Sequence, residues 1–333
     1  MTRTIKPQAL KRLKTTYKTN QGLLLPAVQR HVMRRANDGD YDDDARRSDI
    51  MHPSDMSKSD WCPRADFYRI LNGHPSTAIN PSFSMENVFD EGHRIHRKWQ
   101  GWFWQMGILS GMFECKQCGY IWWDTSPDEC SACPSKRLRY REVPLENKEL
   151  MIAGHSDGMV EDGGDWLELD EPVLIEIKSL SLGTLRFEAP MLYQRYLDGL
   201  GLDEVWREVK RPFASHIKQG TMYCFLAEVR KIVFIYECKW NQQAKEFVVV
   251  PNFDHIKESL ASAKDVADAL RHDMVPYRPH WAKSADGPVC ASCPHRITCW
   301  SIDENDHQED TTPVATPILR AASARRRKAL RSA

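Results

Sequence analysis

Two closely spaced pairs of cysteines constrain the fold of this chain more than any other feature of its sequence. The segment CKQCGYIWWDTSPDECSACP holds two C-x-x-C pairs, formed by Cys115, Cys118, Cys130 and Cys133. Four thiolates at this spacing provide the tetrahedral ligand set that Zn²⁺ prefers in small structural sites. The pattern therefore predicts a zinc-ribbon insert over residues 112–136. We expect this zinc to be structural, because four protein ligands leave no position open for a reacting water.

A second cysteine group lies near the end of the chain. The segment CASCPHRITC contains Cys290, Cys293 and Cys299. Three ligands are one short of a closed site, and Cys62, in the segment WCPR, is the obvious fourth. Cys224 and Cys238 are rivals, although their apolar surroundings are typical of core cysteines. By spacing alone, such a set fits either zinc or an iron–sulfur cluster. A centre that includes Cys62 would close a very long loop of the chain.

Composition indicates the cellular compartment of the chain and the partners that it could bind. The 333 residues have no net formal charge, so any nucleic-acid partner would be bound by a local patch. The N-terminal segment is basic without the apolar run of a signal peptide, and the longest apolar stretches are too short to span a membrane. We therefore expect a cytoplasmic protein without a membrane partner. In a reducing compartment, ten cysteines favour metal binding over disulfides.

The order of elements predicts an α/β fold with a mixed central sheet flanked by helices. Apolar residues recur every three or four positions in 85–106, 213–228 and 254–274, which predicts helices there. Strands are expected at 151–162, 165–170, 172–180, 231–240 and 245–252. We place a basic extension with an acidic linker at 1–50, the main domain at 51–308 and a basic, disordered tail at 309–333.

Three charged residues in the strand region are candidates for metal chemistry. Asp157 lies on a strand beside glycines that would let a ligand approach the backbone, and Glu176 and Lys178 share one strand face. An isolated E-x-K is usually a plain salt bridge, but the combination offers carboxylate ligands for Mg²⁺ or Mn²⁺ and a lysine to orient a water. An imidazole would favour Mn²⁺ over Mg²⁺. The candidates for that ligand are His96, on the expected helix, and its rivals His93 and His155.

The segment HIKQGTMYCF places two polar side chains on an otherwise apolar helix face. Gln219 and Tyr223 are four residues apart, so both would point the same way. An internal hydrogen bond between them is the ordinary explanation for a buried amide and phenol.

In this order, the motifs resemble the RecB-like branch of the PD-(D/E)XK nucleases. They are G-x-x-x-H from Gly92 to His96, G-x-x-D from Gly154 to Asp157, E-x-K at Glu176 and Lys178, and Q-x-x-x-Y at Gln219 and Tyr223. The flanking cysteines are similar to those of its iron–sulfur members, the CRISPR-associated Cas-four nucleases and the AddB-type nuclease domains. The ribbon and the N-terminal extension depart from the minimal Cas-four pattern. They leave replication, recombination, repair or phage-type roles as open as CRISPR adaptation.

The resemblance implies a restriction-endonuclease-like core and specific roles. The metal would be held by His96, Asp157, Glu176 and the backbone carbonyl of Ile177, and Lys178 would be the catalytic lysine. Gln219 and Tyr223 would position Lys178 and the DNA strand. A [4Fe–4S] cluster would be held by Cys62, Cys290, Cys293 and Cys299.

The function that we expect is hydrolysis of DNA by a metal-dependent exonuclease acting on single-stranded ends. The alternatives are an endonuclease that cuts flaps or junctions, a non-catalytic DNA-binding module, and a nuclease that acts on RNA. The basic tail, which holds six arginines and lysines between Arg320 and Arg331, would bind phosphates or be a solvated segment without a role. Trp122 and Trp123 are candidates for stacking on single-stranded bases.

Overall fold

The computed structural model describes residues 24–38, 47–73 and 82–302. Its contacts divide the chain into two units. The first comprises residues 1–46 and 78–91. Its described part contains helix α2 (Leu25–Asp38) and the first turns of α5 (Phe83–Gln105). The second comprises residues 47–77 and 92–333 and contains the rest of α5 and every other described element.

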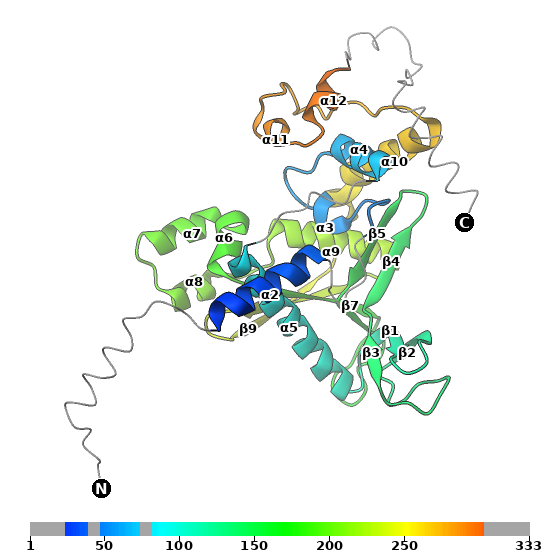
Figure 1. The fold of residues 1–333 in the computed structure, drawn as a ribbon. Helices are drawn as coiled ribbons and strands as arrows, with labels where there is room; N and C mark the ends of the chain where they lie inside the picture. Colours follow the sequence, from blue (N-terminus) through cyan, green and yellow to red (C-terminus); the bar gives the residue numbers. More distant parts are fainter. Residues whose placement is uncertain (1–23, 39–46, 74–81, 303–333) are drawn as a thin grey trace, which may run out of the picture. The chain divides into compact units, whose positions relative to one another are not determined.

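The second unit is built around a mixed seven-stranded sheet (Figure 1). Its strands follow the order β2-β1-β6-β7-β8-β9, with β3 paired to β1. Only the pairing of β7 with β8 is parallel, and the other ladders are antiparallel. The strands are β1 (Ser110–Cys115), β2 (Ile121–Thr125), β3 (Leu138–Tyr140), β6 (Gly158–Val160), β7 (Val173–Leu180), β8 (Ile232–Cys238) and β9 (Ala244–Val249). A separate hairpin pairs β4 (Val143–Asn147) with β5 (Ile152–Ser156).

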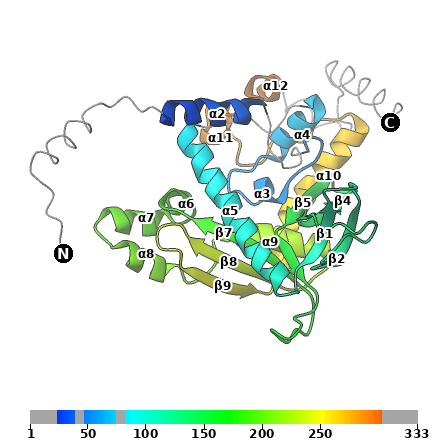
Figure 2. The same cartoon turned by 60° about the horizontal axis from the view of Figure 1, so that its bottom comes forward.

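Alternation along the central strands assigns one core to each face of the sheet. Leu174 of β7 and Phe234 of β8 are buried against α9 (Ala214–Ala227), whereas Ile175 and Ile177 are buried with Ile95 of α5. Figure 2 shows α5 and α9 on either side of these strands. The predicted α/β class, with a mixed central sheet flanked by helices, is confirmed. The period-two pattern of VLIEIKSL thus fixes which side chains of β7 face α9.

A third core joins the beginning and the end of the second unit. Phe67 and Ile70 of α4 (Pro63–Asn72) pack with Val266 and Leu270 of α10 (Lys257–His272). The other helices of this unit are α3 (Pro53–Met56), α6 (Leu182–Glu188), α7 (Pro190–Leu197), α8 (Leu202–Glu208), α11 (Pro288–Ala291) and α12 (Arg296–Trp300), with a 3₁₀ turn η1 (Phe253–Ile256). Within the described residues, no helix combines the length and apolarity needed to cross a bilayer.

One predicted strand is wrong. Residues 165–170 form turns and loop, and Trp166 and Leu167 both direct their backbone N–H groups to the carbonyl of Gly163. The alternating segment DWLELD therefore begins inside a turn that the preceding glycines initiate, and it continues as loop. The strands at 151–162 are two, β5 and β6, with Asp157 between them.

Candidate functional site

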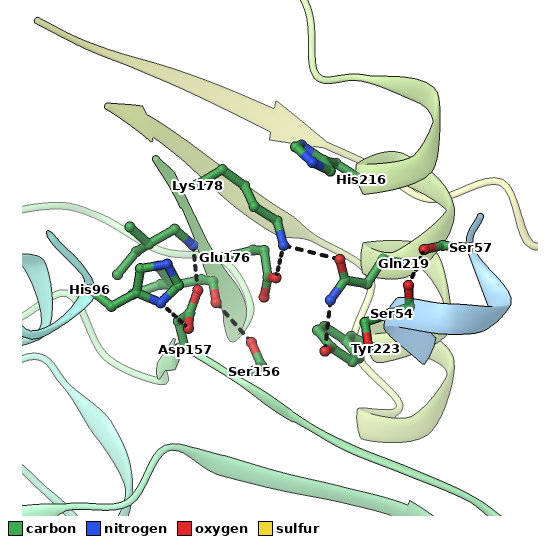
Figure 3. Close-up of polar contacts among 12 residues, drawn as sticks. Ser54, Ser57, His96, Ser156, Asp157, Glu176, Lys178, His216, Gln219 and Tyr223 are labelled. Carbon is green, nitrogen blue, oxygen red and sulfur yellow. Dashed lines mark hydrogen bonds and ion pairs between the residues drawn. The ribbon is translucent and has the colours of Figure 1, made fainter. Parts of the chain in front are cut away.

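Asp157 and Glu176 are brought together by the pairing of β6 with β7. In that antiparallel ladder Gly158 is the partner of Ile175, so extending the register by one residue places Asp157 opposite Glu176. Both carboxyl groups are buried, and the amide of Ile177 donates to Asp157 Oδ2 over 2.6 Å. The close-up in Figure 3 draws the two acids between His96 and Lys178. Sheet register alone therefore assembles the two acids predicted from the sequence.

His96 is the histidine that reaches these acids. Its Nδ1 lies 2.9 Å from Asp157 Oδ1, whereas the rivals His93 and His155 are exposed. One turn further along α5, Gln100 donates to the backbone carbonyl of Asp157 over 3.0 Å. Burial lowers the pKa of His96, but the Asp157 carboxylate outweighs it, so the net direction is upward. Burial likewise raises the pKa of Asp157, but His96 and Lys178 outweigh it and hold that carboxyl group ionised.

Lys178 is held by two acceptors at the centre of the site. Its Nζ lies 2.8 Å from Glu176 Oε1 and donates to Gln219 Oε1 over 3.0 Å. Gln219 in turn donates from Nε2 to the hydroxyl of Tyr223 over 2.8 Å. The predicted hydrogen bond between amide and phenol is present, and it continues to Lys178 (Figure 3). The two polar side chains of this buried helix face are therefore satisfied by each other and by Lys178.

Close packing of α9 on the sheet places Gln219 and Tyr223 within reach of Lys178. A side chain at Gly220 would put Cβ 2.6 Å from Phe234 Cζ and 2.9 Å from Ile232 Cδ1. Only glycine allows the helix backbone to approach β8 this closely. At Gly154, a Cβ would lie 3.2 Å from Tyr223 Cε1. Both glycines therefore leave room for this helix and its phenol.

The donor set fits a divalent cation. The second oxygen of Glu176, Oε2, is buried and has no hydrogen-bond partner among the described residues. Burial, which is only partly offset by Lys178, raises the pKa of Glu176 to about 7. A buried carboxylate oxygen without a partner is costly, and a cation bound by carboxylate and imidazole ligands would satisfy it.

Glu142 is a third acidic group of the site, and sequence reasoning missed it. It precedes β4, and burial raises its pKa to about 8, with a further upward contribution from Asp157. Its side chain also accepts a hydrogen bond from Gln100. The β4–β5 ladder pairs Val143 with Ser156, so extending its register by one residue places Glu142 opposite Asp157. Sequence reasoning missed Glu142 because it did not predict strand β4. His216 was also missed, although it lies three residues before Gln219 on the same helix face.

The four ribbon cysteines come together as predicted. The sulfurs of Cys115 and Cys133 are 3.6 Å apart, and those of Cys118 and Cys130 are 3.7 Å apart. All four sulfurs lie within 4.8 Å of one another, which fits a single tetrahedral ion. The strands that carry this group, β1 and β2, continue the central sheet.

The second cysteine group also converges, in a more open arrangement. Cys62 lies near enough to Cys293 and Cys299 for both to raise its pKa, although burial is the larger cause. Cys293 interacts similarly with Cys290 and Cys299. In residues 24–38, 47–73 and 82–302, only the ribbon cysteines bring three or more ligand atoms of His, Cys, Asp or Glu within 4.8 Å of one another. The rivals Cys224 and Cys238 are buried in the apolar core between α9 and the sheet.

Two arginines approach the end of this cysteine group. The backbone carbonyl of Cys299 accepts from Arg64 Nη2 over 3.3 Å and from Arg278 Nη2 over 3.1 Å. Tyr68 of α4 lies against His295, with ring centroids 5.7 Å apart. The beginning and end of the second unit therefore meet at the cysteines predicted from their spacing.

Several expectations concern other parts of the chain. The tail at 309–333 and most of the extension at 1–50 lie outside the described residues. Of the two ribbon tryptophans, Trp123 is 42% exposed on β2, whereas Trp122 is partly buried and stacks with Tyr120.

No protein-family model and no curated protein matches the chain. Among solved structures, SSO0001 is similar with a TM-score of 0.37 and 12% identity, over 83% of this chain and 98% of that one. The alkaline exonuclease LHK-Exo from Laribacter hongkongensis gives a TM-score of 0.35 and 11% identity, over 68% and 90%. LHK-Exo in complex with dAMP gives 0.36 and 10% over the same shares. Identities this low assign no activity, so the functional conclusion comes from the side chains described above.

Proposed function

We propose that this chain is a metal-dependent DNA nuclease that hydrolyses phosphodiester bonds, specifically an exonuclease acting on single-stranded ends. One observation carries the proposal. Asp157, Glu176 and Lys178 converge, and the buried Glu176 Oε2 has no hydrogen-bond partner among the described residues. The salt bridge to Lys178 leaves this buried oxygen unsatisfied, and a bound cation would satisfy it.

Each residue has a role in this proposal. His96, Asp157, Glu176 and the carbonyl of Ile177 would hold Mg²⁺ or Mn²⁺. Such an ion, when bound, lowers the pKa of a water and offsets charge on a phosphate.

Lys178, held by Glu176 and Gln219, would donate to the reacting phosphate. Tyr223 would keep the Gln219 amide oriented.

The two cysteine groups would hold different centres. The compact ribbon set suits one Zn²⁺. The wider set of Cys62, Cys290, Cys293 and Cys299 suits a larger [4Fe–4S] cluster. Elemental analysis of protein purified without oxygen should find about four irons and about one zinc per chain. Two zinc ions and no iron would contradict the cluster.

A degradation assay with Mn²⁺ or Mg²⁺ tests the activity. The substrates are single-stranded DNA labelled at either end, the same sequence as a circle, a duplex and an RNA strand. Loss of the linear DNA strand, with the circle spared, is the expected result, and both Lys178→Ala and Asp157→Ala should abolish it.

The other outcomes separate the alternatives. Cutting of the circle would indicate an endonuclease, and preferential loss of the RNA strand would indicate a ribonuclease. If every substrate stays intact although both cysteine groups hold their metals, the chain would be a DNA-binding module without catalytic activity.

A further inference from the structure

His216 occupies a position beside the candidate lysine that the proposed roles leave unused. It lies on α9 three residues before Gln219, and its ring extends toward Lys178 in Figure 3. Its hydrogen-bond partner, Tyr236 of β8, is the register partner of Lys178 in the parallel ladder. The helix and the strand therefore converge on one location next to Lys178.

The hydroxyl of Tyr236 determines which nitrogen of His216 carries the proton. This hydroxyl accepts from the amide of Phe213 over 2.9 Å and lies 2.5 Å from His216 Nδ1. Tyr236 is fully buried, and its O–H has no acceptor among the described residues other than this nitrogen. Since an amide can only donate, the hydroxyl must donate to Nδ1. His216 therefore carries its hydrogen on Nε2.

One hydrogen of Lys178 Nζ and the Nε2 hydrogen of His216 are then left without acceptors among the described residues. Lys178 has three hydrogens, and its acceptors in the described chain are Glu176 Oε1 and Gln219 Oε1. His216 Nε2–H has no partner among the same residues. Burial and the charge of Lys178 both lower the pKa of His216, so the imidazole stays neutral and remains a donor. Converging donors of this kind suit an anionic oxygen.

We propose that neutral His216 donates from Nε2 to a non-bridging oxygen of the reacting phosphate, beside Lys178. This inference rests on the proposed nuclease function and adds a second protein donor to the site. Tyr236 acts as a positioning residue, because it fixes the tautomer without touching the substrate.

The test compares single-turnover cleavage of a single-stranded oligonucleotide by wild type and five variants. His216→Phe keeps a ring but loses the donor, and should cut at a rate about 100-fold below wild type, the typical effect of losing one such donor. His216→Gln can place an amide N–H near the position of Nε2 and should recover part of that rate. Exposed His255, changed to Phe, serves as the matched control and should cut like wild type.

The partnership with Tyr236 gives a readout that a merely structural role would not. Tyr236→Phe removes the hydroxyl that fixes the tautomer and should slow cleavage less than His216→Phe. The double variant should be no slower than His216→Phe alone, since the hydroxyl acts only through the imidazole. Additive losses in the double variant would overturn the proposal.

A measurement on the unaltered chain covers the case in which His216→Phe fails to fold. Long-range ¹H–¹⁵N spectra of the histidine rings distinguish the tautomers, and His216→Gln assigns the signals. A neutral ring with hydrogen on Nε2 is expected, and hydrogen on Nδ1 would overturn the proposal. If wild type cuts nothing, the nuclease function itself fails. If wild type and His216→Phe cut equally, only the role of His216 fails.

Discussion

At the scale of single residues, the chain Lys178–Gln219–Tyr223 shows how a helix orients a catalytic candidate. Gln219 touches Lys178 directly, whereas Tyr223 touches only Gln219. Gln219→Ala should therefore lower the cleavage rate by about 10- to 100-fold, the usual effect of losing a supporting partner, and Tyr223→Phe should lower it less. Steady-state kinetics with matched melting temperatures would check this. A larger loss for Tyr223→Phe would mean that the phenol contacts the substrate itself.

Glu142 makes stability depend on pH in a specific window. Its pKa rises from an ordinary 4.5 to about 8 in the folded chain, mainly through burial. Between these values the folded state holds a proton that the unfolded state has lost. Stability therefore falls as pH rises, by up to about 1.4 kcal/mol per pH unit for one proton. Glu142→Gln removes this group and should flatten the dependence.

Urea unfolding of wild type and Glu142→Gln at pH 5, 6.5 and 8 would measure the difference. The variant should gain stability over wild type as pH rises. Parallel curves across this range would show that the Glu142 carboxyl group is not shifted.

The predictable and the unpredictable residues of the site differ in how they are brought together. Glu176 and Lys178 are two apart on a strand, and Gln219 and Tyr223 are four apart on a helix, so periodicity could pair them. Glu142 reaches the site because the β4–β5 hairpin places it opposite Asp157, and the sequence did not predict strand β4. His216 shares a helix face with Gln219, so helix periodicity could have indicated it. Its hydrogen-bond partner Tyr236, however, is distant in the sequence.

At the scale of elements, the ribbon that carries Cys115, Cys118, Cys130 and Cys133 is an extension of the central sheet. β1 pairs along one edge with β2, and along its other edge with β3 and, through Ser110 and Met159, with β6. Cys118→Ser should release zinc and increase amide exchange over residues 110–125. Exchange in β8 should change little, because β6 and β7 stand between it and β1. Hydrogen exchange with zinc analysis tests this, and Ser131→Ala, in the loop between β2 and β3, is the control. Equal deprotection of β8 would show that the sheet unfolds as one unit.

Elements with strong periodicity were predicted, and those with mixed signals were not. The helices at 83–105, 214–227 and 257–272 match expectation within a few residues. The short helices α6, α7 and α8 between β7 and α9 were not anticipated. Each has only seven or eight residues, too few for an apolar stripe to repeat.

At the scale of the molecule, the cysteines of α4 and of the C-terminal segment would close the second unit. Cys62→Ser should lower the iron content and free residues 275–300 from α4. Trypsin should then cut at exposed Lys283 at least about tenfold faster, which corresponds to about 1.4 kcal/mol of lost local stability. Cys133→Ser, which should lose zinc, is the control and should leave this rate unchanged. Equal cleavage rates in both variants would show that Cys62 does not hold residues 275–300 against α4.

The contact between Arg64 and the carbonyl of Cys299 has a consequence for folding during synthesis. These residues are 235 positions apart in the chain. At about 5 to 20 residues per second, α4 leaves the ribosome roughly 10 to 50 seconds before its last partner exists. During that interval Phe67 and Ile70 have no α10 to cover them. This apolar face of α4 therefore stays uncovered during that interval, and folding of this unit can finish only after Cys299 has been synthesised.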